Sequence, residues 1–109
     1  MRQEVSREAR IARLQDIGCL ACLQDGRVGV PSDMHHPLKG YRMGEDITVP
    51  LCAWHHRGVM PGNPDEVAKY WGPSLQLHRR AFRHRYGTDE QLLDFAESLL
   101  SHMYGGTSD

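Results

Sequence analysis

Residues 19–56 begin with CLAC, residues 19–22, and end with CAWHH, residues 52–56. The Cys19-x-x-Cys22 spacing lets one tetrahedral zinc ion bind both thiolates. Cys52-x-x-His55 repeats this spacing about 30 residues later, with nitrogen in place of one sulfur. Four such ligands in two short knuckles are typical of a closed structural zinc site. We therefore expect one Zn²⁺ on Cys19, Cys22, Cys52 and His55. The alternative is three buried cysteines and an incidental histidine.

A metal site suits the length and composition of the chain. Its 109 residues correspond to one domain, 1–109, with a modest core that a bound metal would stabilise. Hydrophobic residues make up 39% and charged residues 25%, which indicates a globular protein. An odd number of cysteines argues against a disulfide framework. No apolar run is long enough for a membrane span, and residues 1–5 do not resemble a signal peptide, so a cytoplasmic protein is predicted.

Two other zinc motifs do not fit the sequence. His35 follows Cys22 at the spacing of a Cys2His2 finger, but no second histidine follows it at the required distance, and residues 30–32 do not predict a helix. A zinc nucleobase deaminase needs His-x-Glu and Pro-Cys-x-x-Cys. Pro50 lies one residue too early for the second pattern, and no histidine begins the first.

Short strands and a short helix are predicted between the knuckles, with longer helices outside them. The strand candidates are residues 33–37 and 47–50, and residues 51–57 predict a helix that Gly58 ends. Residues 2–16 predict an N-terminal helix that ends before Gly18. Asn63 and Pro64 open a helix that Gly72 ends.

Two more helices are predicted near the C-terminus. Ser74 is the expected cap of the first, and its shared face consists of Leu75, His78, Phe82 and Arg85. Thr88 and Gln91 form a capping box that opens the last helix. An apolar stripe on that helix is expected in the core and consists of Leu92, Leu93, Ala96, Leu99, Leu100 and Met103.

Two adjacent histidine pairs, His35-His36 and His55-His56, suggest two separate tasks. Neighbouring residues on a strand point to opposite faces, and neighbouring residues on a helix are about 100° apart. One member of each pair can therefore bind a metal while the other serves a second site. If His55 completes the zinc knuckle, His56 can turn towards His35. The alternative is core or solvated histidines with no common task.

These motifs resemble the HNH endonucleases. The similarity lies in the first knuckle, in MHHPL at residues 34–38, and in DITVPLCAWHH at residues 46–56. The order Pro-Leu-Cys-x-x-His-His resembles the phage recombination-enhancement-function (Ref) nucleases and related prophage proteins. Residues 77–79, Phe82 and residues 86–87 extend the similarity more weakly. The resemblance implies a ββα-metal finger, in which a hairpin and a helix surround one catalytic metal.

We therefore expect an α+β fold: a small zinc-stapled HNH ββα-metal finger over residues 19–57, flanked by N- and C-terminal helices. The helical C-terminal part is expected over residues 63–104.

The resemblance also implies roles for individual residues. His36 would be the general base, and the catalytic metal would be bound by His35 and His56, with His78 as a further ligand. The family's usual Asn corresponds to Ile47 here. Asp46 or Thr48 would then orient the base, and Asp46 is favoured.

The whole chain has a net charge of −1, but the distribution of its charge suggests DNA as a partner. Residues 1–86 carry a net charge of +4 and residues 87–109 a net charge of −5, and 11 of the 13 cationic residues are Arg. Arginine binds phosphate oxygens with two parallel hydrogen bonds. The residues expected to contact the DNA backbone are Lys39, Arg42, Arg79, Arg80 and Arg83, with Arg85. The alternative is a solvated helix face.

The predicted function is that of a metal-dependent endonuclease hydrolysing DNA phosphodiester bonds. It would carry a structural Zn²⁺ and a catalytic Mg²⁺ or other divalent cation. The resemblance further implies a phage or prophage recombination role in a bacterial or phage-infected cell, with a recombinase filament as partner and no membrane. The alternative is a zinc-stabilised module that binds DNA or a recombinase through a degraded catalytic site.

Overall fold

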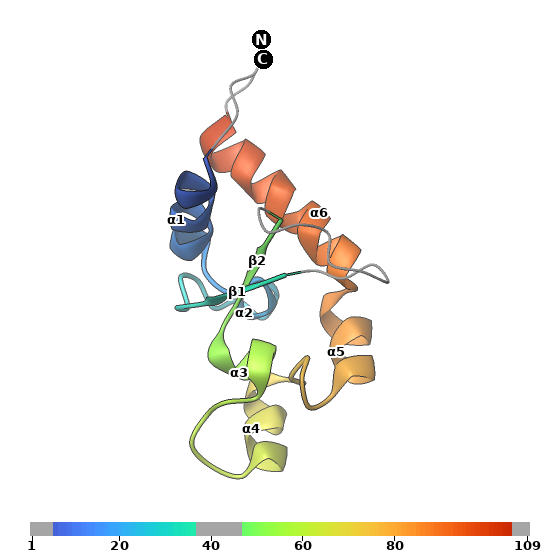
Figure 1. Ribbon diagram of the computed structural model, residues 1–109. Coiled ribbons are helices and arrows are strands. Elements are labelled where there is room, and N and C mark those ends of the chain that lie inside the picture. Colours follow the sequence, from blue (N-terminus) through green and yellow to red (C-terminus); the bar gives the residue numbers. More distant parts are fainter. Residues whose placement is uncertain (1–5, 37–46, 106–109) are drawn as a thin grey trace.

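A two-stranded hairpin followed by a short helix lies at the centre of the fold (Figure 1). The computed structural model describes residues 6–36 and 47–105. Strand β1 (Asp33–His35) pairs antiparallel with β2 (Val49–Leu51), so that Asp33 lies opposite Leu51 and His35 opposite Val49. Helix α3 (Ala53–Arg57) follows β2 directly. The α+β class and the ββα order predicted from the sequence are thus confirmed.

Helices lie on both sides of this ββα element (Figure 1). They are α1 (Arg7–Ile17), α2 (Leu20–Gln24), α4 (Pro64–Trp71), α5 (Arg79–Tyr86) and α6 (Asp89–Leu100), and α6 continues into the π-helical turn η1 (Ser101–Gly105). Within the described residues, no helix combines the length and apolarity that a bilayer span requires.

The N-terminal half differs from the sequence prediction in three ways. Helix α1 begins at Arg7, because the Ser6 side chain caps it by accepting a hydrogen bond from the Ala9 N–H (3.1 Å). Helix α2 was not predicted. It begins at the first knuckle, where the Cys19 sulfur accepts from the Cys22 N–H (3.4 Å). The strands are also shorter than expected, and part of the first predicted strand lies outside the described residues.

In the C-terminal half, the predicted caps of α4 and α6 are confirmed and the predicted cap of α5 is wrong. Asn63 caps α4, and Thr88 and Gln91 form the capping box of α6. Helix α5 starts only at Arg79, because Ser74 instead stabilises a turn, accepting from the Leu77 N–H (3.4 Å). Arg85 is exposed rather than on the buried face, and its guanidinium pairs with Asp25 (2.9 Å).

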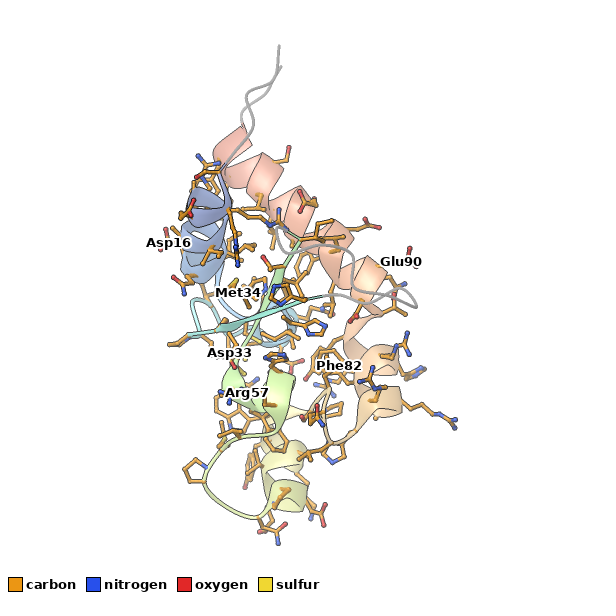
Figure 2. All side chains as sticks on the ribbon, in the orientation of Figure 1. Asp16, Asp33, Met34, Arg57, Phe82 and Glu90 are labelled. Atoms are coloured by element: carbon orange, nitrogen blue, oxygen red, sulfur yellow. The ribbon has the colours of Figure 1, made fainter. Side chains whose placement is uncertain are left out.

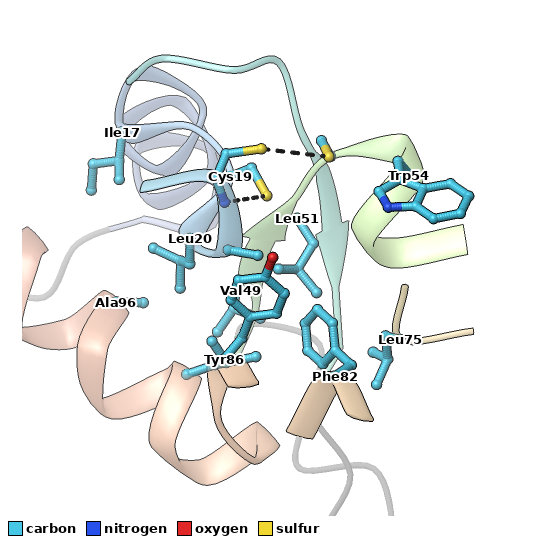
Figure 3. Close-up of a cluster of buried hydrophobic side chains, with 14 of the residues drawn as sticks. Ile17, Cys19, Leu20, Val49, Leu51, Trp54, Leu75, Phe82, Tyr86 and Ala96 are labelled. Carbon is cyan, nitrogen blue, oxygen red and sulfur yellow. Dashed lines mark hydrogen bonds between the residues drawn. The ribbon is translucent and has the colours of Figure 1, made fainter. Parts of the chain in front are cut away.

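The core lies between the hairpin and the helices (Figure 3). Its largest fully buried side chains are Trp54, Phe82, Leu14, Leu20, Leu51 and Leu92. Most of the α6 stripe contributes as predicted: Leu92 and Ala96 are buried, and Leu93, Leu99 and Leu100 pack against the core. Met103 does not contribute, with 53% of its surface exposed. The α-helical period ends at Ser101, and the wider π-helical turn rotates Met103 away from the stripe.

Arg10 links α1 to the hairpin and to α6. Its guanidinium donates to the Thr48 carbonyl (2.8 Å) and forms an ion pair with Glu97 (2.6 Å). The Arg10 side chain is 15% exposed but that of Glu97 is 53% exposed, so the ion pair itself is screened by water and adds little stability. The outer helices therefore hold β2 in place by polar contacts as well as by apolar packing.

Gly72 offers a test of the packing between α4 and α5. Gly72 has φ +85°, and a Cβ there would overlap the Tyr86 hydroxyl, whereas Gly26 has φ +90° in open space. We expect Gly26→Ala to cost about 1 kcal/mol for backbone strain alone. Gly72→Ala should cost about 1–3 kcal/mol more, because Tyr86 must move. Denaturant melts of both variants measure the difference, and equal losses would show that Tyr86 shifts freely.

Candidate metal centres

The two knuckles share one local geometry, which explains why both begin with cysteine. Cys19 and Cys52 each cap a short helix, and each sulfur accepts from the N–H of the residue three positions later (3.4 Å). That third residue, Cys22 or His55, supplies the second side chain of the knuckle. The hydrogen bonds hold each pair of side chains on the same side of its turn. Figure 3 draws the bond of the first knuckle.

The hairpin brings the two knuckles together into one buried Cys3His cluster. The Nδ1 atom of His55 lies 3.2 Å from the Cys52 sulfur and 3.5 Å from those of Cys19 and Cys22. The sulfurs of Cys22 and Cys52 are 3.9 Å apart, and all four ligand atoms lie within 4.8 Å of one another. A tetrahedral zinc with bonds of about 2.3 Å to sulfur and about 2.0 Å to nitrogen implies separations of about 3.8 Å and about 3.5 Å. The predicted cluster is thus present and can hold a zinc ion.

The rest of the His55 ring is also arranged for metal binding. Its Nε2 atom donates to the Trp71 carbonyl (2.6 Å), which leaves the Nδ1 lone pair directed at the three sulfurs. The protein thus selects the tautomer that a Cys3His zinc site needs.

The ionisation of the cluster shows the need for a positive charge. The hydrogen bond with Cys19 raises the pKa of the Cys22 thiol, whereas hydrogen bonds from Cys19 and Cys22 lower the pKa of Cys52. Burial lowers the pKa of His55, but the Cys19 and Cys52 sulfurs outweigh it and raise the pKa to about 9. Zinc binds the thiolate form of cysteine, so metal binding to this cluster must release protons.

A second group of side chains lies around His35 on β1 and His56 on α3. Their ring centroids are 5.1 Å apart, with the rings edge to face at 65°. Burial lowers the pKa of His56, and the neighbouring His35 lowers it further, against the opposing effect of Asp33. The His56 imidazole is therefore neutral at pH 7 and has a lone pair for a metal ion.

Two carboxylates that the sequence analysis did not identify lie beside these histidines. The Nε2 atom of His35 is 3.1 Å from a carboxylate oxygen of Asp89, and the Nδ1 atom of His56 is 3.4 Å from one of Asp33. Arg57 donates to the same Asp33 oxygen (2.8 Å; Figure 2). Asp33 could have been found, since it lies two residues before His35 on one strand face. Asp89 is 54 residues from His35 and carries no local signal beyond that of a helix start.

The remaining predicted catalytic residues are placed differently. His36 is half-buried directly after β1, where strand alternation no longer sets its direction. The Nδ1 atom of His78 accepts from the Ser74 N–H (3.1 Å), and its ring lies 6.2 Å from that of Trp54. Within the described residues, no contact joins His78 to His35 or His56.

Thr48 is buried, and within the described residues its hydroxyl has no hydrogen-bond partner. Asp46 lies outside the described residues.

The predicted DNA contacts on α5 are exposed. Arg79, Arg80 and Arg83 form no ion pair within residues 6–36 and 47–105. An open hollow of about 490 Å³ beside α5 is lined in part by Arg83, His84 and Phe95. The other two predicted contacts, Lys39 and Arg42, lie outside the described residues.

The adjacent His55 and His56 provide a test of the two separate sites. His55→Ala removes a ligand of the buried cluster and should cost at least about 4 kcal/mol of stability. His56→Ala removes a part-exposed ring with one long polar contact and should cost no more than about 1 kcal/mol. Thermal melts of zinc-loaded protein give the comparison. Equal losses would mean that the two rings serve one site.

Removal of zinc should unfold the protein, because the metal-binding free energy of a small domain is part of its folding free energy. We expect about one tightly held zinc per chain by elemental analysis and a loss of helical circular dichroism on chelation. A folded, zinc-free preparation that resists chelators would contradict this.

The chain matches a protein-family model almost from end to end. The model is described as recombination enhancement, RecA-dependent nuclease, and it matches residues 4–101. No curated protein matches the chain. The matched region begins before α1 and ends just after α6, so it contains the Cys3His cluster, the His35 and His56 group, and helix α5. The chain therefore belongs to the family of recombination-enhancing, RecA-dependent nucleases.

Proposed function

We propose that this nuclease is a metal-dependent HNH endonuclease that hydrolyses DNA phosphodiester bonds. The observation that carries the proposal is the pairing of His35 and His56 across the ββα element, beside but separate from the Cys3His cluster. His55 belongs to the Cys3His cluster, and the adjacent His56 lies beside His35. A purely structural zinc domain has no need for the second histidine group.

The side chains around His35 and His56 suit a catalytic divalent cation. Imidazole nitrogens are ligands for several such cations, and the rings of His35 and His56 lie 5.1 Å apart with a carboxylate beside each. His35 and His56 would hold the ion, with His78 as the further ligand inferred from the family resemblance. When bound, a cation such as Mg²⁺ neutralises phosphate oxygens and stabilises the leaving 3′ oxygen.

In this proposal His36 is the general base. A neutral imidazole takes a proton from water at physiological pH, and the water oxygen then attacks phosphorus in line with the leaving oxygen. Asp46 is proposed to orient His36. Thr48, whose buried hydroxyl has no partner among the described residues, is the other candidate for this role.

Helix α5 is proposed to hold the DNA backbone. Its buried side is fixed to the zinc cluster, since the rings of Phe82 and Tyr86 lie 6.4 Å and 5.1 Å from that of His55. Its opposite side exposes Arg79, Arg80 and Arg83. Lys39 and Arg42 are proposed to add contacts from the segment between the strands. Such contacts position a duplex without reading its sequence.

The partner that we propose is DNA carrying a recombinase filament, in the cytoplasm of a bacterium or a phage-infected cell. The family description names RecA dependence, which supports this choice. A second candidate function is a zinc-stabilised module that binds DNA or the recombinase without cutting. Ile47, in place of the usual Asn of the HNH motif, favours this alternative.

The general base can be tested by substitution. His36→Ala should lower the plasmid-nicking rate by about 10²–10⁴-fold while leaving DNA affinity nearly unchanged, because the base acts in the transition state. His102→Ala, an exposed histidine of η1, is the control. If the parent protein never cuts DNA with Mg²⁺ or Mn²⁺ and a recombinase filament present, the binding-module alternative is correct.

The arginine helix can be tested by the salt dependence of DNA binding. Replacing Arg79, Arg80 and Arg83 with Ala should weaken binding to all sequences alike and reduce the slope of log K against log[salt] by up to about 3. A control variant should remove the same charge elsewhere, by Ala substitution of Arg7, Arg13 and Lys69. If the control weakens binding as much, α5 is not the interface.

A further inference from the structure

Three histidines share one arrangement, in which one ring nitrogen is held by an oxygen and the other is left for a second partner. In His55, Nε2 contacts the Trp71 carbonyl and Nδ1 lies among the sulfurs. In His35, Nε2 contacts Asp89, and in His56, Nδ1 contacts Asp33. His55 of the Cys3His cluster therefore shows how His35 and His56 can be oriented: an oxygen contacts one ring nitrogen, and the other nitrogen faces the candidate metal site.

The two carboxylates determine which nitrogen carries the proton. A neutral imidazole has one N–H donor and one acceptor nitrogen, and an ionised carboxylate only accepts. In its neutral form, therefore, His35 would donate from Nε2 and His56 from Nδ1. The lone pairs that remain are those of Nδ1 of His35 and Nε2 of His56.

We propose that Asp89 and Asp33 are positioning residues that select and hold these two tautomers for the divalent cation. This inference rests on the proposed function, in which His35 and His56 hold that cation. Histidine ligands of metals usually donate their other N–H to a carboxylate or carbonyl, which fixes the ring and strengthens it as a ligand. Neither carboxylate needs to touch the metal for this purpose.

The fold holds the carboxylate of Asp89 more firmly than that of Asp33, whose side chain is 37% exposed. Asp89 is the first residue of α6, directly after the capping box of Thr88 and Gln91, and its side chain is 16% exposed. Helix α6 is itself anchored in the core by Leu92 and Ala96. Asp33 lies in the paired strand β1 and accepts from Arg57 (2.8 Å) as well as contacting His56. The finger thus depends on the C-terminal helix for the orientation of one of its own histidines.

The first test reads the tautomers directly. In ¹⁵N NMR spectra of protein loaded with one equivalent of zinc, His35 should be in the Nε2–H form and His56 in the Nδ1–H form. The opposite tautomer at either ring, or an even mixture, would overturn the proposal for that residue.

The second test measures Mn²⁺ binding to zinc-loaded protein by calorimetry without DNA. Asp89→Asn and Asp33→Asn keep an acceptor oxygen but lose the charge, and each should weaken Mn²⁺ binding by about 10- to 100-fold. Asp94→Asn, on the exposed side of α6, is the matched control and should bind as the parent does. Thermal melts verify folding, and the two Asn variants provide independent tests should one of them not fold.

The outcomes separate this inference from the proposed function. If both Asn variants bind Mn²⁺ as tightly as the parent, the carboxylates have only a structural role and the inference is overturned. Complete loss of binding, as expected for His35→Ala, would make the carboxylate a direct ligand and would also overturn it. If His35→Ala and His56→Ala bind Mn²⁺ as the parent does, the proposed metal site itself is wrong.

Discussion

The contact of His55 Nδ1 with three cysteine sulfurs is the interaction on which the other parts of the structure depend. It joins α2 to the segment where β2 ends and α3 begins, about 30 residues later in the sequence. The same ring extends the connection, because its Nε2 holds the Trp71 carbonyl at the end of α4 and its face packs against Phe82 and Tyr86 of α5. A chain with so small a core gains much of its order from such a centre.

This centre also explains how adjacent histidines reach different partners. Helix α3 is only five residues long and is capped by Cys52, so His55 must face the sulfurs. The helical rotation of about 100° per residue then turns His56 towards β1, where it meets His35 and Asp33. The orientation of the second site is therefore a geometric consequence of the first, and any distortion of the zinc knuckle is transmitted to His56 within one residue.

The sequence predicted what depends on local spacing. The two knuckles and the caps at Asn63 and Thr88 are each encoded within a few residues, and all of them are present. The hairpin was expected from the family resemblance, and it is present as well. Long-range contacts were not predictable in this way. The Asp89 carboxylate meets His35 because α6 packs against β2, the strand paired with β1. Ser74 does not cap α5, because its hydroxyl stabilises a turn instead. The roles of His36 and Asp46 remain predictions that rest on the family resemblance.

The helices outside the finger are part of the candidate site rather than mere support. Arg10 connects α1 to the carbonyl of Thr48, next to the strand that faces His35, and it pairs with Glu97 of α6. The same α6 carries Asp89 at its other end, beside His35. The exposed arginines of α5 are anchored to the zinc cluster by the opposite side of that helix. The family match over residues 4–101 likewise includes these helices as well as the ββα element. The ββα element alone would lack the first knuckle, the Asp89 carboxylate beside His35 and the exposed arginines of α5.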